Sequence, residues 1–276
     1  MAIAHNITEA LTSFITATGT QERAILIGGQ AIRDWHAAQT HALTGTAMTL
    51  PAPRATTDMD VHLLIEKEDR EDVAKAIETD WIPSSEPSGG RVFQFIWRHD
   101  TAITLDLIAT KDAQARHPIQ FIAKLGTGTD IGAVRVLESW IIRHHLHERC
   151  FGPALAQLRM RRLNRLGLAA SKVGAIGVTI NELIAAGRET REPQAWTRRL
   201  DKDLQDLDLL LQPVWVDGLW EPQYEAVGEE IQRAWANTIE PLVSLRNQPP
   251  LMRLESFTMI ERMKSRLPRT LTSTFR

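Results

Sequence analysis

Two aspartates separated by one residue, Asp58 and Asp60, are the residues of this sequence best suited to chemistry. They stand in the segment 58–65, whose alternating apolar residues predict a strand. Side chains two residues apart on a strand point the same way, about 7 Å from each other. Unpaired carboxylates so close repel each other, and Mg²⁺ or Mn²⁺ relieves this by taking carboxylate and phosphate oxygens as ligands. The pair therefore predicts a metal site, with two solvated strand-edge aspartates as the alternative.

A third carboxylate, Asp106, stands in the segment 103–108. Alternation places Ile103, Leu105 and Leu107 on one face of this predicted strand and Asp106 on the other, where a carboxylate among apolar neighbours needs a partner. If this strand lies beside 58–65, three carboxylates meet. They could then hold two cations roughly 3.5–4 Å apart, the arrangement used for displacement at phosphorus. Asp106 would act as the general base.

A glycine pair, Gly28-Gly29, follows the buried strand 24–27 and precedes a predicted helix over 30–39. Backbone N–H groups at a helix N-terminus bind phosphate, and glycine allows the backbone to approach it closely. The pair predicts a phosphate-binding turn, with an ordinary tight turn as the alternative.

The remaining periodicity predicts the elements that position these groups. A capped helix over 6–18, a loop over 42–57, a helix over 68–79 and paired strands over 91–97 and 102–108, joined at His99-Asp100, complete the first part. Helical spacing then dominates in five segments: 131–147, 154–186, 196–212, 222–244 and 251–266. The sequence therefore predicts an α+β core over 1–115 and an α-helical carboxy-terminal domain over 116–276.

Composition narrows the class of protein. The 276 residues include one cysteine, which excludes an internal disulfide and fits a reducing compartment. The start lacks a secretory pattern, and no apolar run is long enough to span a bilayer, so we expect a cytoplasmic protein without membrane contact.

Charge is distributed unevenly along the chain. Residues 1–110 carry 8 Lys and Arg against 15 Asp and Glu, whereas the segment 143–172 is basic and holds one acidic residue, Glu148. This asymmetry suggests metal-binding carboxylates facing a surface that receives phosphates, with a solvated helix face as the alternative.

The motif Ile27-Gly-Gly-Gln-Ala31, followed by Arg54-Ala-Thr-Thr-Asp-Met-Asp60, resembles the nucleotidyltransferases of the DNA polymerase β superfamily. More narrowly, it is similar to the AbiEii-type toxin nucleotidyltransferases. The resemblance covers 24–109 well and 165–212 loosely, where Lys172 and the Lys202-Asp203 helix fall on the family's later motifs. Gln30 departs from the pattern, because serine or another small residue is common at that place.

The resemblance implies roles for individual residues. Asp58, Asp60 and Asp106 would be the catalytic and metal-binding carboxylates. Nucleotide binding would involve Gly28, Gly29, Gln30, Arg54, Thr57, Lys172 and Asp203.

The resemblance also implies an activity. We expect Mg²⁺-dependent transfer of a nucleoside monophosphate from an NTP such as ATP to a hydroxyl of an acceptor, either tRNA or protein. The enzyme would be the toxin of a toxin–antitoxin pair and would have a cognate antitoxin as partner. The alternatives are a nucleotidyltransferase acting on a small aminoglycoside-like molecule and a catalytically silent nucleotide- or RNA-binding module.

Overall fold

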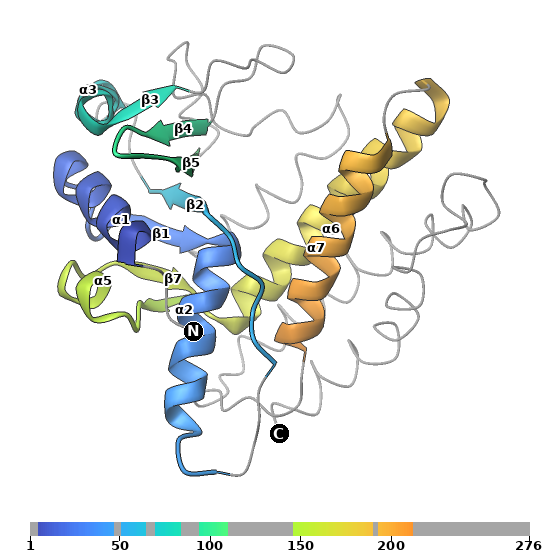
Figure 1. The fold of residues 1–276 in the computed structure, drawn as a ribbon, viewed down its shortest axis with the longest axis horizontal. Helices are drawn as coiled ribbons and strands as arrows, with labels where there is room; N and C mark the ends of the chain where they lie inside the picture. The colour runs from blue at the N-terminus through green and yellow to red at the C-terminus, as the bar shows by residue number, and fades with distance from the viewer. Residues whose placement is uncertain are drawn as a thin grey trace. The chain divides into compact units, whose positions relative to one another are not determined.

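The computed structural model of the chain describes residues 5–46, 51–64, 70–83, 94–109, 146–189 and 193–211. These residues form a mixed α/β structure, shown in Figure 1. The chain divides into two compact units, Met1–Asn164 and Arg165–Arg276. The described part of the first unit contains a mixed sheet with helices, as the α+β prediction required, and that of the second contains two helices.

In the described residues, seven strands form one sheet in the order β3-β4-β5-β2-β1-β7-β6. Strand β2 lies in the middle and pairs in parallel with β5 and antiparallel with β1, which in turn pairs in parallel with β7. The other neighbours are antiparallel. The strands are β1 (Ala24–Ile27), β2 (Asp58–Leu63), β3 (Trp81–Pro83), β4 (Gln94–Trp97), β5 (Asp100–Ala109), β6 (His147–Arg149) and β7 (Arg161–Leu163).

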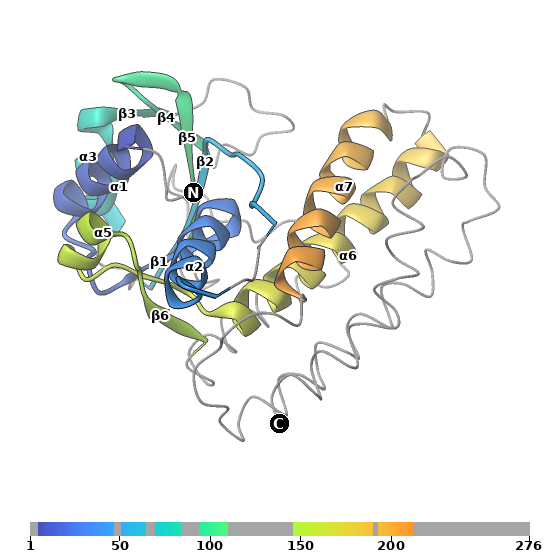
Figure 2. The same cartoon turned by 60° about the horizontal axis from the view of Figure 1, so that its bottom comes forward.

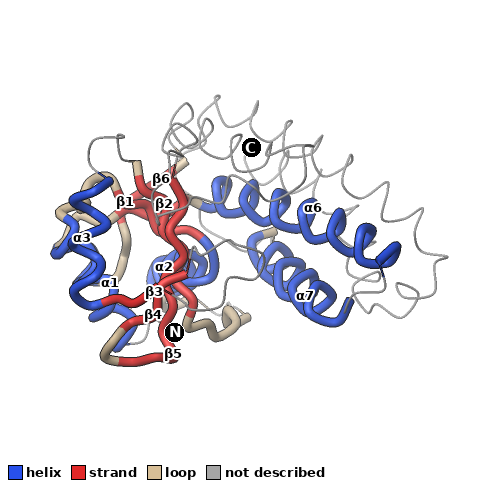
Figure 3. Tube along the Cα trace, turned by 90° about the horizontal axis from the view of Figure 1, so that it is seen from above, coloured by secondary structure: helices blue, strands red, loops and turns tan. Residues whose placement is uncertain are grey.

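The helices of the first unit are α1 (His5–Thr18), α2 (Gly28–Ala42), α3 (Arg70–Asp80) and the short α5 (Pro153–Gln157). Helices α1 and α3 contact each other and lie on the same side of the sheet (Figures 2 and 3). The second unit contains α6 (Arg165–Glu189) and α7 (Pro193–Leu210), which pack side by side.

One face of the central sheet is apolar. Met59, Val61 and Leu63 of β2 are fully buried, and so are the alternate residues Ile103 and Leu105 of β5. The apolar side of α1 is buried as well, through Leu11, Phe14 and Ile15. Burial of apolar surface is the main driving force for folding, so this layer forms the core of the first unit. The predicted alternation of both strands is confirmed.

The segment 154–186, which the sequence predicted as one helical stretch, is divided differently. It holds α5, the strand β7 and only then α6. Arg159 adopts a positive φ of 55° in the turn before β7. Because β7 pairs with β1, the division between the compact units falls after Asn164 rather than at residues 115–116.

Of the other predicted helices and strands, some are confirmed, some are wrong and some lie outside the described residues. The helices over 6–18, 30–39, 68–79 and 196–212 are confirmed within a few residues at each end. Strand β3 was not predicted, and His147, at the end of the predicted helix 131–147, begins β6 instead. The rest of that helix and the predicted helices 222–244 and 251–266 lie outside the described residues. None of the described helices is long and apolar enough to cross a membrane.

One polar residue of β2 is as buried as the core. His62 is 1% exposed, and neither of its ring nitrogens has a hydrogen-bond partner among the described residues. Its neighbours in register are Ile25 on β1 and Ile108 on β5. Burial disfavours the charged imidazolium and lowers the pKa of His62 to about 4.

His62 should make the fold sensitive to acid. As pH falls from 6.5 toward 4, the unfolded chain binds a proton at His62 that the folded chain does not bind, so the free energy of unfolding decreases. We expect a loss on the order of 2–3 kcal/mol in this window. Urea unfolding at pH 7.5 and pH 4.5 measures this loss of free energy of unfolding. The loss should be smaller for His62→Leu than for the unsubstituted chain, and His36 is present in both proteins. An equal loss in both proteins would contradict this assignment.

Candidate functional site

The three predicted carboxylates lie on one face of the sheet. In the parallel pairing of β2 with β5, Asp58 stands opposite Thr104 and Asp60 opposite Asp106. Register partners on neighbouring strands, about 4.8 Å apart, point to the same face, as do residues two apart on one strand. Asp58, Asp60 and Asp106 are all partly buried there. Asp106 therefore faces the same way as the other two.

Asp58 is held at the start of β2 by two hydroxyl groups. The Thr104 hydroxyl donates a hydrogen bond to Asp58 Oδ1 at 2.9 Å, and the Asp58 backbone N–H donates to Thr56 Oγ1 at 3.2 Å. Among the residues that the structure describes, no group of three or more His, Cys, Asp or Glu side chains is close enough together to hold a metal ion by itself.

The glycine turn lies directly against Asp60. Gly28 has a φ of +67°, which favours glycine, and a Cβ built on it would lie 1.9 Å from Asp60 Oδ2. A Cβ on Gly29 would lie 2.8 Å from Thr56 Cγ2 and 3.1 Å from Arg54 Nη2. The two glycines, predicted from a strand–helix junction alone, thus adjoin the Arg-x-Thr-x-Asp-x-Asp segment.

Helix α2 holds the loop that precedes β2 through three side chains. Gln30 Nε2 donates to the Thr56 carbonyl at 2.6 Å, Arg33 Nη1 donates to the Arg54 carbonyl at 3.3 Å, and His36 Nε2 lies 2.9 Å from the Pro51 carbonyl. Burial lowers the pKa of His36, so the neutral ring donates this bond at neutral pH. Residues three apart on a helix share a face. The three-residue spacing of Gln30, Arg33 and His36 is the feature of the sequence that could have predicted the contact between α2 and this loop.

Two of the predicted nucleotide-binding residues are placed by backbone contacts. Gln30 is fully buried, and its Nε2 donates the hydrogen bond to the Thr56 carbonyl in the loop. Its Oε1 has no partner within the described residues. Thr57 is exposed, and its carbonyl accepts a hydrogen bond from the Thr104 N–H at 3.5 Å. Neither Thr104 nor the Arg33 and His36 contacts were anticipated from sequence.

A buried ion pair joins α2 to the segment that carries β6 and β7. Asp34 accepts hydrogen bonds from the Phe151 and Gly152 N–H groups at 2.7 and 2.9 Å and from Arg162 Nε at 2.7 Å. Arg162 also pairs with Glu148. Asp34 and Arg162 are both nearly inaccessible to solvent, so each buried charge requires the other.

Two arginines stand opposite each other at the edge of the sheet. Arg149 of β6 is the register partner of Arg161 of β7, and neither has a carboxylate partner among the described residues. Arg161 also pairs with Ile25, which pairs with His62, so register places the arginines on the face that carries Asp60. Like charges directly opposite each other destabilise a sheet. A bound anion would relieve this repulsion.

The other two predicted residues lie together in the second unit. Lys172 Nζ is 2.8 Å from Asp203 Oδ1 and 2.7 Å from Asp206 Oδ2, and all three side chains are buried. Burial alone would lower the pKa of Lys172, but the charges of Asp203 and Asp206 outweigh it and raise the pKa. The sequence allowed the pairing of Asp203 with Lys172, and the structure adds Asp206.

Comparisons of the chain with protein-family models, with curated proteins and with solved structures each found no significant match. The resemblance to nucleotidyltransferases therefore depends on the motif residues, and their roles stay predictions.

The contact between Gly28 and Asp60 can be tested with two alanine substitutions. Gly28→Ala should lower the free energy of unfolding by at least about 2 kcal/mol, because the new Cβ meets both an unfavourable φ and the Asp60 carboxylate. Gly19→Ala is the matched control, because Gly19 has a φ of +62° and nothing within 4 Å of its Cβ position. Urea unfolding of both variants measures the difference. Equal losses would show that the Asp60 contact has no cost.

Proposed function

We propose that the chain is a metal-dependent nucleotidyltransferase that transfers a nucleoside monophosphate from an NTP to a hydroxyl of an acceptor. The observation that carries this proposal is the shared sheet face of Asp58, Asp60 and Asp106, with the backbone of Gly28 against Asp60. Carboxylates beside a glycine turn and a helix N-terminus provide ligands for a cation and donors for phosphate.

The donor set suits a hard divalent cation. Asp58, Asp60 and Asp106 offer only oxygen ligands, and Mg²⁺ is commonly bound by one or two carboxylates that act together with substrate phosphates. These residues would hold Mg²⁺ or Mn²⁺, which when bound would neutralise phosphate charge. A site completed by the nucleotide does not require three protein ligands to be close together beforehand.

The triphosphate would bind at the start of α2. Ile27, the N-cap residue of this helix, makes no side-chain cap hydrogen bond, and the first N–H groups of the helix would donate to the phosphates. Gly28 and Gly29 leave room for the phosphates, and Arg54, whose side chain adjoins Gly29, would add positive charge.

Asp106 is the general base of the proposed reaction. It would accept the proton of the acceptor hydroxyl as the oxygen forms its bond to the α-phosphorus. The bond from that phosphorus to the bridging oxygen breaks at the same time, and pyrophosphate leaves with its electron pair. The chain contributes mainly by positioning the reactants and stabilising their charge. The assignment of Lys172 and Asp203 to nucleotide binding is an additional prediction, independent of this step.

Arg149 and Arg161, which have no carboxylate partner within the described ranges, bear on the acceptor. Arg149 and Arg161 lie on the same face as the carboxylates and favour a polyanion such as tRNA over a neutral protein side chain or a cationic aminoglycoside-like molecule. A role as the toxin of a toxin–antitoxin pair, with a cognate antitoxin as partner, belongs to the same proposal. A silent module that only binds nucleotide or RNA is the alternative.

Transfer of label tests the proposal. We expect the protein, incubated with α-labelled NTPs, Mg²⁺ and total RNA or lysate, to label the acceptor, and Asp106→Asn to reduce the rate about 10²–10⁴-fold through loss of the general base. Asp60→Asn should reduce it at least as much. Asp72→Asn, on an exposed position of α3, is the matched control and should be fully active. Nucleotide binding without transfer by the unsubstituted protein would instead support the silent module.

The arginine pair makes a separate prediction about the acceptor. Arg149→Gln combined with Arg161→Gln should lower kcat/KM for an RNA acceptor about tenfold and reduce the salt dependence of RNA binding by about two in slope, because two phosphate contacts are lost. The KM for the NTP should not change. Arg98→Gln, an exposed arginine in the β4–β5 turn, is the control. Unchanged RNA kinetics in the double variant would exclude this surface as the acceptor site.

A further inference from the structure

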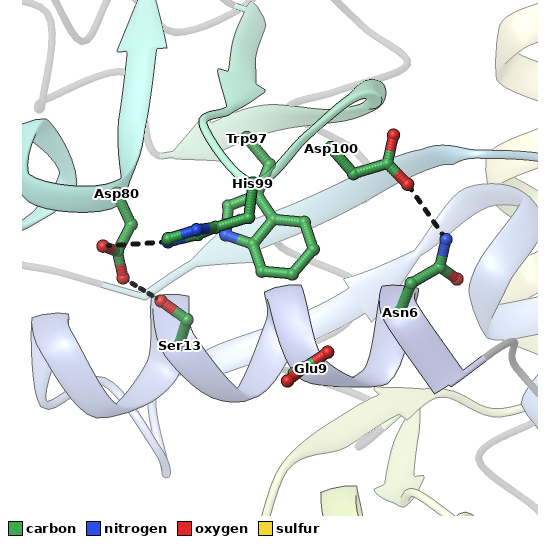
Figure 4. A pocket seen from close by; sticks show the side chains of 7 residues that line it. All are labelled: Asn6, Glu9, Ser13, Asp80, Trp97, His99 and Asp100. Atoms are coloured by element: carbon green, nitrogen blue, oxygen red, sulfur yellow. Dashed lines mark hydrogen bonds and ion pairs between the residues drawn. The ribbon is translucent and has the colours of Figure 1, made fainter.

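A pocket of about 500 Å³ lies between α1 and the turn that joins β4 to β5 (Figure 4). Its volume is within the range of small-molecule sites. It is lined by Asn6, Glu9, Ser13, Asp80, Trp97, His99 and Asp100. Three of these residues, Asn6, Glu9 and Ser13, belong to α1, so the pocket lies on the α1 side of the sheet and not on the carboxylate face.

The pocket is acidic, and its carboxylates differ in their partners. Asp80 accepts a hydrogen bond from the Ser13 hydroxyl and lies 3.7 Å from His99 Nε2. Asp100 Oδ2 accepts a hydrogen bond from Asn6 Nδ2 at 3.1 Å. Glu9, on the exposed side of α1, has no ion pair or hydrogen bond with any residue in the described ranges. The pocket is therefore negatively charged, and Glu9 is the carboxylate whose hydrogen-bonding capacity no other described residue uses.

Trp97 supplies an independent indication of a ligand. Its side chain is 6% exposed, and its Nε1–H has no acceptor among the described residues. Figure 4 shows the Trp97 ring lying over α1, between the Asp80–His99 pair and the Asn6–Asp100 pair. His99 packs edge-on against this ring at 5.2 Å between centroids. A buried N–H donor without an acceptor is costly, and an oxygen in the pocket would satisfy it.

We propose that this pocket binds a small organic cation that carries an ammonium or guanidinium group together with a hydroxyl or carbonyl oxygen. The Glu9 carboxylate pairs with the cation beside Trp97. Trp97 Nε1–H, which has no acceptor among the described residues, is the donor to the ligand oxygen. The three carboxylates exclude ligands that bring a carboxylate of their own.

This site is independent of the proposed nucleotidyl transfer. None of its lining residues belongs to the carboxylate face or to the glycine turn. Its test is a binding measurement without nucleotide, metal or acceptor, so failure of this inference and failure of the proposed function are separate results.

Calorimetric titration of the full chain with N-acetyl-L-argininamide tests the proposal. N-acetyl-L-citrullinamide, which has the same shape without the charge, should bind at least about tenfold more weakly. Glu9→Gln should weaken binding of the charged probe about fivefold or more, because it removes the unpaired charge but keeps the side-chain shape. Glu22→Gln is the matched control, because Glu22 is exposed and paired with Arg159 outside the pocket.

Trp97→Phe keeps an aromatic ring and removes the N–H donor, so it should weaken the charged probe while leaving the preference for charge. Circular dichroism and urea unfolding verify that the Trp97→Phe variant, which changes a buried residue, is folded. Glu9→Gln tests the site without altering the core.

Three results would each overturn the proposal. The first is no binding of the charged probe at about 10 mM, which corresponds to less than about 3 kcal/mol of binding free energy. The second is equal binding of the two probes, and the third is unchanged binding of the charged probe by Glu9→Gln.

Discussion

The close approach of Gly28 to Asp60 constrains the rest of the candidate site. A side chain at position 28 would occupy the space of the Asp60 carboxylate, so the end of β1 and the start of α2 can adjoin β2 only because this residue is glycine. The same junction aims the N-terminus of α2 at the carboxylate face. Gln30 and His36 then fasten the loop before β2 to the helix, which fixes where Asp58 begins its strand. The positions of α2, of the loop before β2 and of β2 itself therefore depend on one another.

The charges of the molecule fall into two groups. One group is buried and paired with opposite charges: Asp34 with Arg162 in the first unit, and Lys172 with Asp203 and Asp206 in the second. Removing one partner of such a pair leaves an uncompensated buried charge, at a typical cost of about 3–5 kcal/mol. These ion pairs hold α2 to β7 and α6 to α7. Arg149 and Arg161 and the carboxylate of Glu9 are instead accessible and without described counter-charges, which is why both ligand proposals depend on them.

The two faces of the sheet divide these proposals. Alternate residues of β2 and β5 build an apolar layer on one face and place the three aspartates on the other. The apolar layer fixes the strands and with them the spacing of the carboxylates. Where β4 leaves this layer, Trp97 meets α1 and the pocket forms beside it. The proposed nucleotide chemistry and the proposed cation site would thus use opposite faces of the same sheet.

The sequence by itself determined the spacing of apolar residues and, with it, the local secondary structure. The alternation over 58–65 and 103–108 gave both strands and the common direction of Asp58 and Asp60, and helical spacing gave α1 and α7, because these patterns follow from backbone geometry over a few residues. Only the tertiary structure decided that β2 lies beside β5 with Asp60 opposite Asp106, and that the segment after residue 146 adds two strands to the sheet. It alone also brought Asp206 to Lys172 and Trp97 to Glu9. Such pairings join residues far apart in the chain, and their free energy comes from packing and long-range hydrogen bonds that no local pattern encodes.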